Sequence, residues 1–398
     1  MTAEPGTTLP DGVRLPASVR VERIDLLRTR RPLIRPFRTA FGRQVDREVL
    51  LVRITTPSAQ GWGECATPAA PVYSAEFTDA AALVLRDHLV PRLLATGAPL
   101  SAAEVAPRLA AIRGQRMAKA ALEAAVLDVQ LRTAGVSLAQ ALGAVVARIP
   151  VGISLGIPDG GIPALLEEVD AAREAGYQRV KVKVAPGFDV AALTAIRARF
   201  GPGLGLQVDA NAGYDPDDAD HLAALDGLDE LGLTMIEQPF APDRLRDHAR
   251  LAARWRTPVC LDESITDPVR ARDAVECGAA GIVNIKPGRI GGLLASVQVR
   301  DVCRERGIPV WCGGMLETGI GRAANVALAA LEGFRFPGDL SASDRYWAED
   351  LTEPFELVDG HLDVPDTPGI GRRPLPGRLD DAEVTTVAHR NGVITTRW

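Results

Sequence analysis

The second half of the chain alternates short apolar runs with longer amphipathic ones. From about residue 149, runs rich in β-branched residues are followed by stretches rich in Ala, Leu, Arg and Glu, with Gly, Pro or Asp between them. This alternation predicts parallel strands joined by crossover helices. Seven strands are expected, at residues 151–156, 180–184, 206–210, 234–238, 259–263, 282–286 and 309–314. A short eighth strand is expected between Phe334 and Leu340.

Eight strands of this kind predict a TIM-type barrel that lacks its last helix, because no strong helical period follows Leu340. The open doubly wound sheet is the alternative. It is disfavoured because no G-x-G-x-x-G follows an early strand and because the repeat runs to eight units. The expected fold class is α/β, a modified TIM barrel (β/α)7β with an N-terminal α+β domain.

The first part of the chain has a different pattern. Residues 21–64 alternate apolar and polar positions with turn breaks, which predicts an antiparallel sheet, and residues 74–94, 101–112 and 116–135 have helical spacing. We expect an α+β domain at residues 19–148 and the barrel at 149–344, with a C-terminal segment, 345–398, that returns to the first domain. Residues 1–18 are rich in Pro, Gly and Thr and predict a disordered leader.

Polar residues end five of the expected strands, at intervals of 24 to 28 residues. They are Lys183, Asp209, Glu237, Asp262 and Lys286. Catalytic residues of such barrels lie at the carboxyl ends of the strands. The two lysines end strands two and six of eight, so we expect them to face each other across the mouth. A solvated rim lysine or a helix N-cap explains any one of these residues alone, whereas five in phase favour a catalytic site.

The stretch VKVKV places Lys181 and Lys183 on one face of a strand, the inner face of the barrel. Burial and the ammonium of Lys181 would both lower the pKa of Lys183 and make it a base. Three carboxylates between the lysines predict a divalent cation with oxygen ligands, Mg²⁺ or else Mn²⁺ or Co²⁺. A cation between two lysines suits removal of a proton α to a carboxylate, with an enediolate as the intermediate.

Composition excludes several other classes. A net charge of −6 and a pI near 5.6 argue against nucleic acid or an anionic membrane as partner. No long apolar run and no signal peptide are present, so the expected location is the cytoplasm. The five cysteines are scattered and predict neither disulfides nor a zinc site. The five histidines fall outside the expected strand ends, which argues against histidine chemistry.

Seven motifs make the chain similar to a known family. They are VKVKV, VDANAGY, IEQPF, CLDESI, NIKPGRIGG, VWCGGMLETGIGRAAN and PGDLSASDRYWAEDLTEPF. They resemble the muconate lactonising subgroup of the enolase superfamily, and within it the N-acylamino acid racemases, also called N-succinylamino acid racemase/o-succinylbenzoate synthases. The resemblance covers about residues 21–375 and implies that the N-terminal α+β domain caps the barrel. Lysine bases beside Mg²⁺ are the known arrangement of enolase-superfamily sites.

The resemblance also assigns roles to individual residues. It makes Lys183 and Lys286 the acid/base catalysts, and it directs Lys181 to the substrate carboxylate. It makes Arg289 a residue that tunes Lys286. The metal ligands it implies are Asp209, Glu237 and Asp262, and the substrate contacts are Ser154, Asn211, Gly314, Met315, Leu316, Phe37 and Tyr73. The outer positions have a plain alternative, because Ser154 and Asn211 could satisfy loop backbone groups and Phe37 and Tyr73 could pack the core of their own domain.

The implied function is Mg²⁺-dependent racemisation of N-succinyl or N-acetyl amino acids by 1,1-proton transfer, together with o-succinylbenzoate synthase activity, either of which could be the main role. Muconate cycloisomerase and dipeptide epimerase are alternatives, the latter disfavoured because Ser341 stands where a second acid would complete D-x-D after Asp339. A Schiff-base aldolase or a non-catalytic binding protein are alternatives outside the superfamily. The implied partners are a small carboxylate substrate and further copies of the chain, as a dimer or an octamer.

Overall fold

A parallel sheet forms the centre of the molecule. The computed structural model describes residues 7–8, 12–39, 42–390 and 393–397. The sheet has seven strands, and their order in space follows their order in the chain. They are β7 (Ile153–Leu155), β8 (Val180–Lys183), β9 (Leu206–Asp209), β10 (Ile236–Glu237), β11 (Val259–Leu261), β12 (Ile282–Ile285) and β13 (Val310–Cys312). Each lies within a strand that the sequence predicts.

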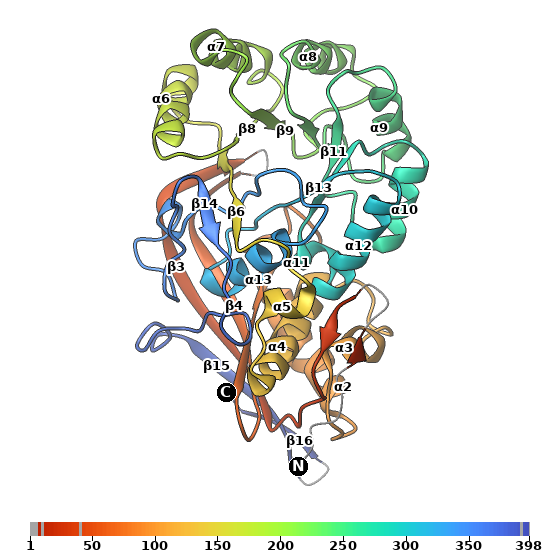
Figure 1. The fold of residues 1–398 in the computed structure, drawn as a ribbon, viewed down its shortest axis with the longest axis vertical. Helices are drawn as coiled ribbons and strands as arrows, with labels where there is room; N and C mark the ends of the chain where they lie inside the picture. The colour runs from red at the N-terminus through yellow and green to blue at the C-terminus, as the bar shows by residue number, and fades with distance from the viewer. Residues whose placement is uncertain (1–6, 9–11, 40–41, 391–392, 398) are drawn as a thin grey trace.

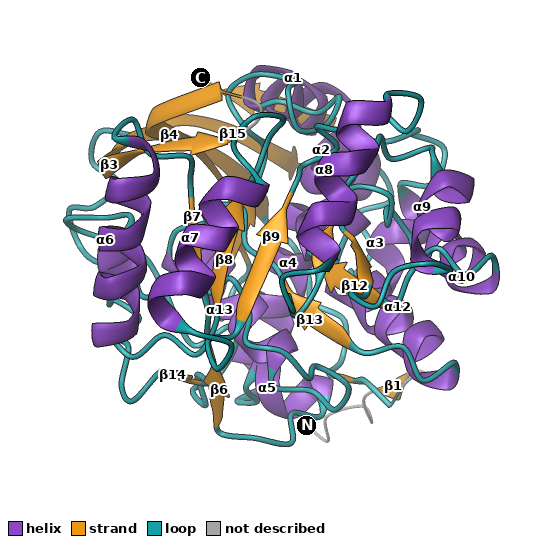
Figure 2. Cartoon of the chain, turned by 90° about the horizontal axis from the view of Figure 1, so that it is seen from above, coloured by secondary structure: helices purple, strands orange, loops and turns teal. Residues whose placement is uncertain are grey.

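Helices cover the outside of this sheet (Figure 2). They are α6 (Gly161–Glu174), α7 (Val190–Phe200), α8 (Ala219–Asp229), α9 (Leu245–Ala252), α10 (Pro268–Glu276), α12 (Leu293–Glu305) and α13 (Gly319–Ala329), with a short α11 (Pro287–Ile290) after β12. A 3-10 turn, η2 (Ser343–Arg345), is the only helical element described after α13 in the chain as far as residue 390. The predicted fold class, a modified TIM barrel with an antiparallel cap, is confirmed.

The expected eighth strand is not a strand, although its segment closes the ring. Phe334 forms a single parallel bridge with Val310, and Gly338 forms one with Val151. Gly152 N donates to Gly338 O at 2.8 Å. The segment between the two bridges includes Pro337, which has no N–H to donate, so a continuous ladder cannot form there.

The N-terminal domain is an antiparallel sheet packed on helices. Its sheet has the order β16-β15-β3-β4-β5, so a C-terminal hairpin pairs with the first long strand. The strands are β3 (Arg23–Thr39), β4 (Gly42–Thr55), β5 (Gln60–Cys65), β15 (Glu383–Arg390) and β16 (Val393–Arg397). The helices are α1 (Thr78–Val84), a π-helical turn η1 (Leu85–Leu89), α2 (Val90–Leu94), α3 (Ala102–Arg108), α4 (Arg116–Ala134) and α5 (Leu138–Leu142). Two small pairs complete the fold, β1 (Thr7–Thr8) with β2 (Arg14–Leu15) and β6 (Arg148–Pro150) with β14 (His361–Asp363).

Part of the expected leader is folded. Val13 and Leu15 are buried, and Gln130 of α4 donates to the carbonyl oxygens of Pro16 and Ala17 at 3.1 Å. The low apolar content of residues 1–18 predicts disorder, but Val13 and Leu15 are buried in the core of the domain. Residues 1–6 and 9–11 lie outside the described residues.

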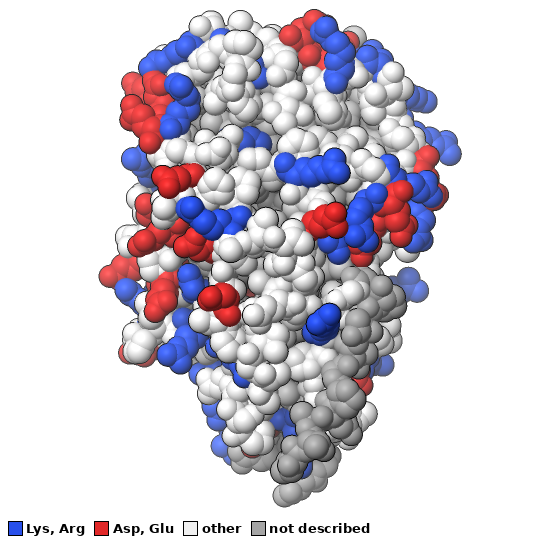
Figure 3. Space-filling model, in the orientation of Figure 1, with Lys and Arg blue, Asp and Glu red and all other residues white. Residues whose placement is uncertain are grey.

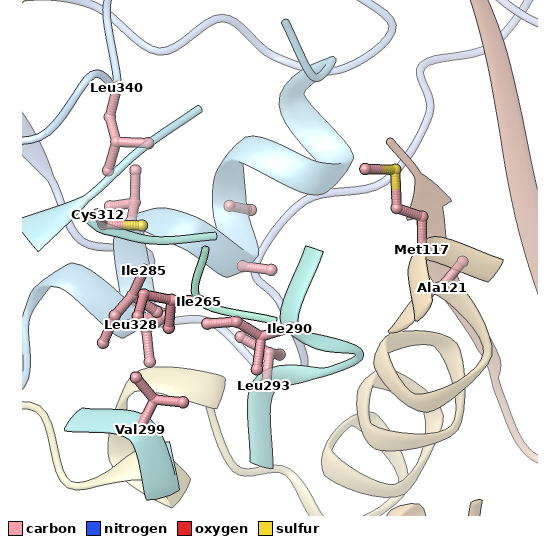
Figure 4. Packing of buried hydrophobic residues seen from close by; sticks show 14 of the residues in the cluster. Met117, Ala121, Ile265, Ile285, Ile290, Leu293, Val299, Cys312, Leu328 and Leu340 are labelled. Carbon is pink, nitrogen blue, oxygen red and sulfur yellow. The ribbon is translucent and has the colours of Figure 1, made fainter. Parts of the chain in front are cut away.

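The N-terminal domain is joined to the barrel by a continuous core. Met117 and Ala121 of α4 belong to the same buried apolar cluster as Ile290 and Leu293 on the barrel side (Figure 4). Two buried acids add polar contacts across the junction: Glu64 of β5 accepts from Gly321 N at 3.0 Å, and Glu123 of α4 accepts from Leu294 N at 3.0 Å. These carboxylates satisfy backbone N–H groups in the first turns of α13 and α12.

The hairpin of β3 and β4 is long enough to run from the cap sheet along the side of the barrel (Figure 1). Its far end thereby reaches the cavity described below. On the face shown in Figure 3, basic and acidic side chains are interspersed and form no extended basic surface. Among the helices of the described chain, none has the length and apolar character needed to cross a bilayer.

Candidate active site

A cavity of about 370 Å³ opens at the carboxyl ends of the barrel strands. Ten of the residues predicted for the site line it. They are Phe37, Tyr73, Ser154, Lys181, Lys183, Asn211, Lys286, Gly314, Met315 and Leu316. The hairpin of β3 and β4 and the loop after β5 supply one wall, and the strand ends supply the other. Phe37 and Tyr73 therefore line the cavity rather than only packing the core of their own domain.

The two lysines predicted to act as acid and base stand on opposite parts of the sheet. Lys183 ends β8, and Lys286 directly follows β12, so β9, β10 and β11 lie between them. Both are buried and both line the cavity. The strand-end pattern therefore brings the two ammonium groups to one cavity from strands that are not neighbours.

The three predicted metal ligands are wholly buried next to the lysines. Lys181 Nζ lies 3.0 Å from both Asp209 Oδ2 and Glu237 Oε2, and Lys183 Nζ lies 2.6 Å from the same Asp209 oxygen. Lys286 Nζ lies 2.6 Å from Asp262 Oδ2. The carboxylates are therefore already engaged by ammonium groups.

The assignment of these three carboxylates as metal ligands stays a prediction. Among the described residues, no three His, Cys, Asp or Glu side chains are grouped so that they could hold a metal ion as they stand. Asp209 and Glu237 meet at Lys181, whereas Asp262 is held by Lys286 and Arg289. Each acid is thus neutralised by the cations nearest to it.

The three strand-end lysines differ in the direction of their pKa shifts. Burial lowers the pKa of Lys183, and the charge of Lys181 adds to this, although Asp209 opposes it. Burial also acts on Lys181, but Asp339, Glu237 and Asp209 outweigh it and raise the pKa of that lysine. For Lys286, burial is outweighed by Tyr73, Glu237 and other acids, so its pKa is raised. The direction predicted for Lys183 agrees with the structure.

Tyr73 and Arg289 surround the pair formed by Lys286 and Asp262. Tyr73 Oη donates to Asp262 Oδ1 at 3.3 Å and accepts from Lys286 Nζ at 3.5 Å and from Arg289 Nη1 at 3.4 Å. Arg289 forms a close ion pair with Asp262 and donates to the carbonyl oxygens of Ile265 and Asn284. Asp262 and Tyr73 thus contact both Arg289 and Lys286 and link the two cations.

Asn211 and Ser154 have different surroundings. Asn211 accepts from Lys183 at 2.7 Å and donates to Glu263 at 3.0 Å, with a φ of 43°. It therefore links the base to a neighbouring acid rather than serving only its loop. The hydroxyl of Ser154 is buried and has no hydrogen-bond partner among the described residues, although Ser154 lines the cavity.

Sequence reasoning missed the part that Asp339 and Arg179 play around Lys181, although Asp339 lines the cavity. Asp339 lies 2.5 Å from Lys181 and 2.8 Å from Arg179. It follows the eighth parallel segment, so the strand-end spacing that selected the other acids could have found it. Arg179 comes before β8 rather than after a strand, and no sequence signal points to it.

The comparisons with known proteins agree with this geometry. Residues 164–376 match the model of the "Enolase C-terminal domain-like" family, and residues 23–143 match "Mandelate racemase / muconate lactonizing enzyme, N-terminal domain". The chain is 53% identical over 363 residues to an N-succinylamino acid racemase of Amycolatopsis, covering 91% of this chain and 97% of that one. It is 45% identical to an o-succinylbenzoate synthase of Geobacillus stearothermophilus, covering 89% and 93% of the two chains.

A solved structure supports the same relationship. The enolase-superfamily member from Listeria innocua superposes with a TM-score of 0.87 at 36% identity, covering 93% of this chain and 99% of that one. Fold and comparisons thus define a capped barrel of the enolase superfamily. Within it, the chain belongs to the family of N-succinylamino acid racemases and o-succinylbenzoate synthases.

Proposed function

We propose that this chain racemises N-acylated amino acids, N-succinyl amino acids in particular, by moving the α-proton between two lysines. The observation that carries the proposal is that Lys183 and Lys286 line one cavity from strands separated by three others. One lysine removes the α-proton from one face of the substrate. The other lysine returns a proton to the opposite face, which inverts the configuration.

The residues around each lysine prepare it for this exchange. Burial favours the neutral form of Lys183, and Asn211 Oδ1 accepts from its Nζ and so fixes the direction of that group. Lys286 donates to Asp262, and Tyr73 and Glu237 favour its charged form. In this arrangement Lys183 is prepared to accept a proton and Lys286 to donate one. Lys181, which lines the cavity between the acids, would attract the substrate carboxylate.

We propose Mg²⁺ as the cofactor, held by Asp209, Glu237 and Asp262. The donor chemistry fits, because wholly buried carboxylates at successive strand ends are the oxygen ligands that this ion prefers. To bind the ion, the three acids must exchange their present ion pairs with the lysines and Arg289 for the metal. The buried Oε2 of Glu263, next to Asp262, has no hydrogen-bond partner among the described residues and adds unused acceptor capacity there. When bound, the ion would supply positive charge beside the substrate carboxylate.

A second activity, o-succinylbenzoate synthesis, is favoured by the relatives with that name at 41% to 45% identity. It needs the same first step, removal of a proton α to a carboxylate, followed by loss of water. The lone Asp339 does not favour a dipeptide epimerase, because Lys181 and Arg179 already neutralise it and Ser341 supplies no second acid.

The test is exchange of the α-hydrogen in D₂O, followed by NMR for both enantiomers of an N-succinyl amino acid with Mg²⁺ present. Wild-type protein should exchange both. Lys183→Ala should abolish exchange from one enantiomer, and Lys286→Ala should abolish it from the other. Equal loss from both enantiomers in each variant would contradict the division of labour between faces.

Formation of o-succinylbenzoate from its precursor, followed in the same preparations, tests the second activity. Sedimentation of the same preparations tests the expected homo-oligomer.

A further inference from the structure

Arg47, an arginine of the cap, also lines the cavity. Arg47 lies on β4, and only 3% of its surface is exposed. It lines the cavity together with Lys183 and Lys286. Its Nε and Nη2 have no hydrogen-bond partner, and the described residues provide no ion pair for its guanidinium within 4.0 Å. Arg47 is therefore a buried cation at the cavity without a carboxylate partner among the described residues.

The register of the cap sheet explains why Arg47 points to the cavity. In β4, Arg47 shares a face with Leu51, and Leu51 is paired with Glu64 of β5. Glu64 in turn accepts from Thr318 and Gly321 at the start of α13, so this face of the sheet looks toward the barrel. Arg47 thus approaches the cavity from the cap, while the lysines approach it from the strand ends.

Two other buried arginines, Arg179 and Arg289, have carboxylate partners, whereas Arg322, which also lines the cavity, donates to Ser341 O. Arg179 pairs with Asp339, and Arg289 pairs with Asp262. A buried charge without such a partner is strongly unfavourable, and a guanidinium is suited to binding a carboxylate through two parallel hydrogen bonds. Burial lowers the pKa of Arg47, and the charges of Glu64 and Glu317 oppose this shift.

We propose that Arg47 binds the distal carboxylate of a dicarboxylic acyl group whose other end is held at the lysines. This inference rests on the proposed function and specifies its substrate class. A succinyl chain ends in such a carboxylate, both in N-succinyl amino acids and in the succinyl-bearing precursor of o-succinylbenzoate. One guanidinium would therefore serve both activities. The cavity, at about 370 Å³, lies within the usual range for small-molecule sites.

Glu317 offers an alternative role for Arg47. Its Oε2 is buried and also has no hydrogen-bond partner among the described residues, and its charge acts on Arg47. If Arg47 served only to neutralise Glu317, its loss would destabilise the fold and weaken every ligand alike. If it binds the substrate, its loss would affect one ligand and would leave the melting temperature equal or higher, because an uncompensated buried charge is removed.

The experiment measures binding to the full chain by calorimetry, with Mg²⁺ present. The two ligands are the N-succinyl and the N-succinamoyl forms of one amino acid, which differ only in a distal carboxylate or carboxamide. Arg47→Gln should weaken binding of the succinyl form by roughly 10- to 100-fold and change binding of the succinamoyl form by less than about 3-fold. Arg47→Lys keeps the positive charge but loses the two parallel N–H donors of the guanidinium. Its affinity for the succinyl form should lie between those of the wild type and Arg47→Gln.

Arg53→Gln is the matched control. Arg53 lies on the same face of β4, pairs with Asp25 and stacks on Trp62, so its loss should leave the ratio of the two affinities unchanged. Equal weakening of both ligands by Arg47→Gln, or equal affinity of the wild type for both, would overturn the inference. Selective binding of the succinyl form without α-hydrogen exchange would leave the inference standing and refute the proposed racemase.

Discussion

Lys183 Nζ lies 2.6 Å from Asp209 Oδ2, and Lys181 Nζ lies 3.0 Å from the same oxygen. The first proposed metal ligand is therefore also the main anionic partner of the proposed base. Any cation that binds Asp209 must compete with these two ammonium groups. The charge of Asp209 raises the pKa of Lys183, so release of Lys183 from Asp209 would lower that pKa further.

This competition predicts the response to metal. Mg²⁺ should raise the melting temperature of the wild type by a few degrees, because a ligand at 100 times its Kd stabilises a protein by about 2.7 kcal/mol. In Asp209→Asn the rise should be lost, and racemisation should fall by more than about 1,000-fold with it. Differential scanning calorimetry with and without EDTA checks the first result. Asp226→Asn, at a half-exposed surface acid paired with Arg254, is the control. A rise of equal size in both variants would place the ion elsewhere.

Tyr73→Phe tests the surroundings of Lys286. The change removes the hydroxyl that accepts from Lys286 and Arg289 and donates to Asp262. Loss of a hydrogen bond to a charged group should lower kcat by about 10-fold, mainly in the direction that uses Lys286 as the acid. Steady-state racemisation from each enantiomer measures this. Tyr177→Phe, outside the cavity and before β8, should have no such effect. A change in KM alone would indicate that Tyr73 only contacts substrate.

Asn211→Ala tests the surroundings of Lys183. It removes the oxygen that accepts from Lys183 at 2.7 Å and the amide that donates to Glu263. Without that contact the base is less well directed, so α-hydrogen exchange from the enantiomer that depends on Lys183 should fall by about 10-fold or more. Exchange from the other enantiomer, which depends on Lys286, is the internal control. Parallel loss from both would mean that Asn211 mainly maintains its loop, whose φ of 43° an alanine tolerates poorly.

The sequence allowed the barrel and most of the site to be predicted because both depend on local, repeating features. Lys183, Asp209, Glu237, Asp262 and Lys286 each end a short apolar run, and parallel connections bring such ends together whatever the side chains do afterwards. Repulsion among the three acids was expected to gather a metal. That site stays a prediction. The ion pairs of the three acids depend on which cation lies nearest each oxygen, and strand spacing does not contain that information.

Contacts made by the cap were harder to predict, since they join segments far apart in the chain. Arg47 stands in an ordinary period-two strand, and only the pairing of β4 with β5 and the position of α13 show that it reaches the cavity. The eighth segment failed as a strand because Pro337 interrupts its hydrogen bonds, and this proline was visible in the sequence.

The buried acid Glu123 gives the pH dependence of stability a definite sign. Burial raises its pKa from an ordinary value of 4.5 to about 7, although Leu294 N and Leu293 N favour its charged form. The folded protein therefore binds this proton more tightly than the unfolded chain does. The contribution of Glu123 to stability is fully present below about pH 4.5 and is lost as the pH rises to about 7.

Glu123→Gln removes this dependence while it keeps an oxygen for Leu294 N. A shift of this size corresponds to about 3 kcal/mol, so the loss of unfolding free energy between pH 5 and pH 8 should be smaller in the variant by an amount of that order. Urea unfolding at the two pH values measures the difference, and Glu353→Gln, at an exposed position, is the control. If the variant and the wild type lost the same free energy of unfolding, the carboxyl of Glu123 would titrate normally in the folded state. The start of α12, where Leu293 and Leu294 contact Glu123, would then be open to water.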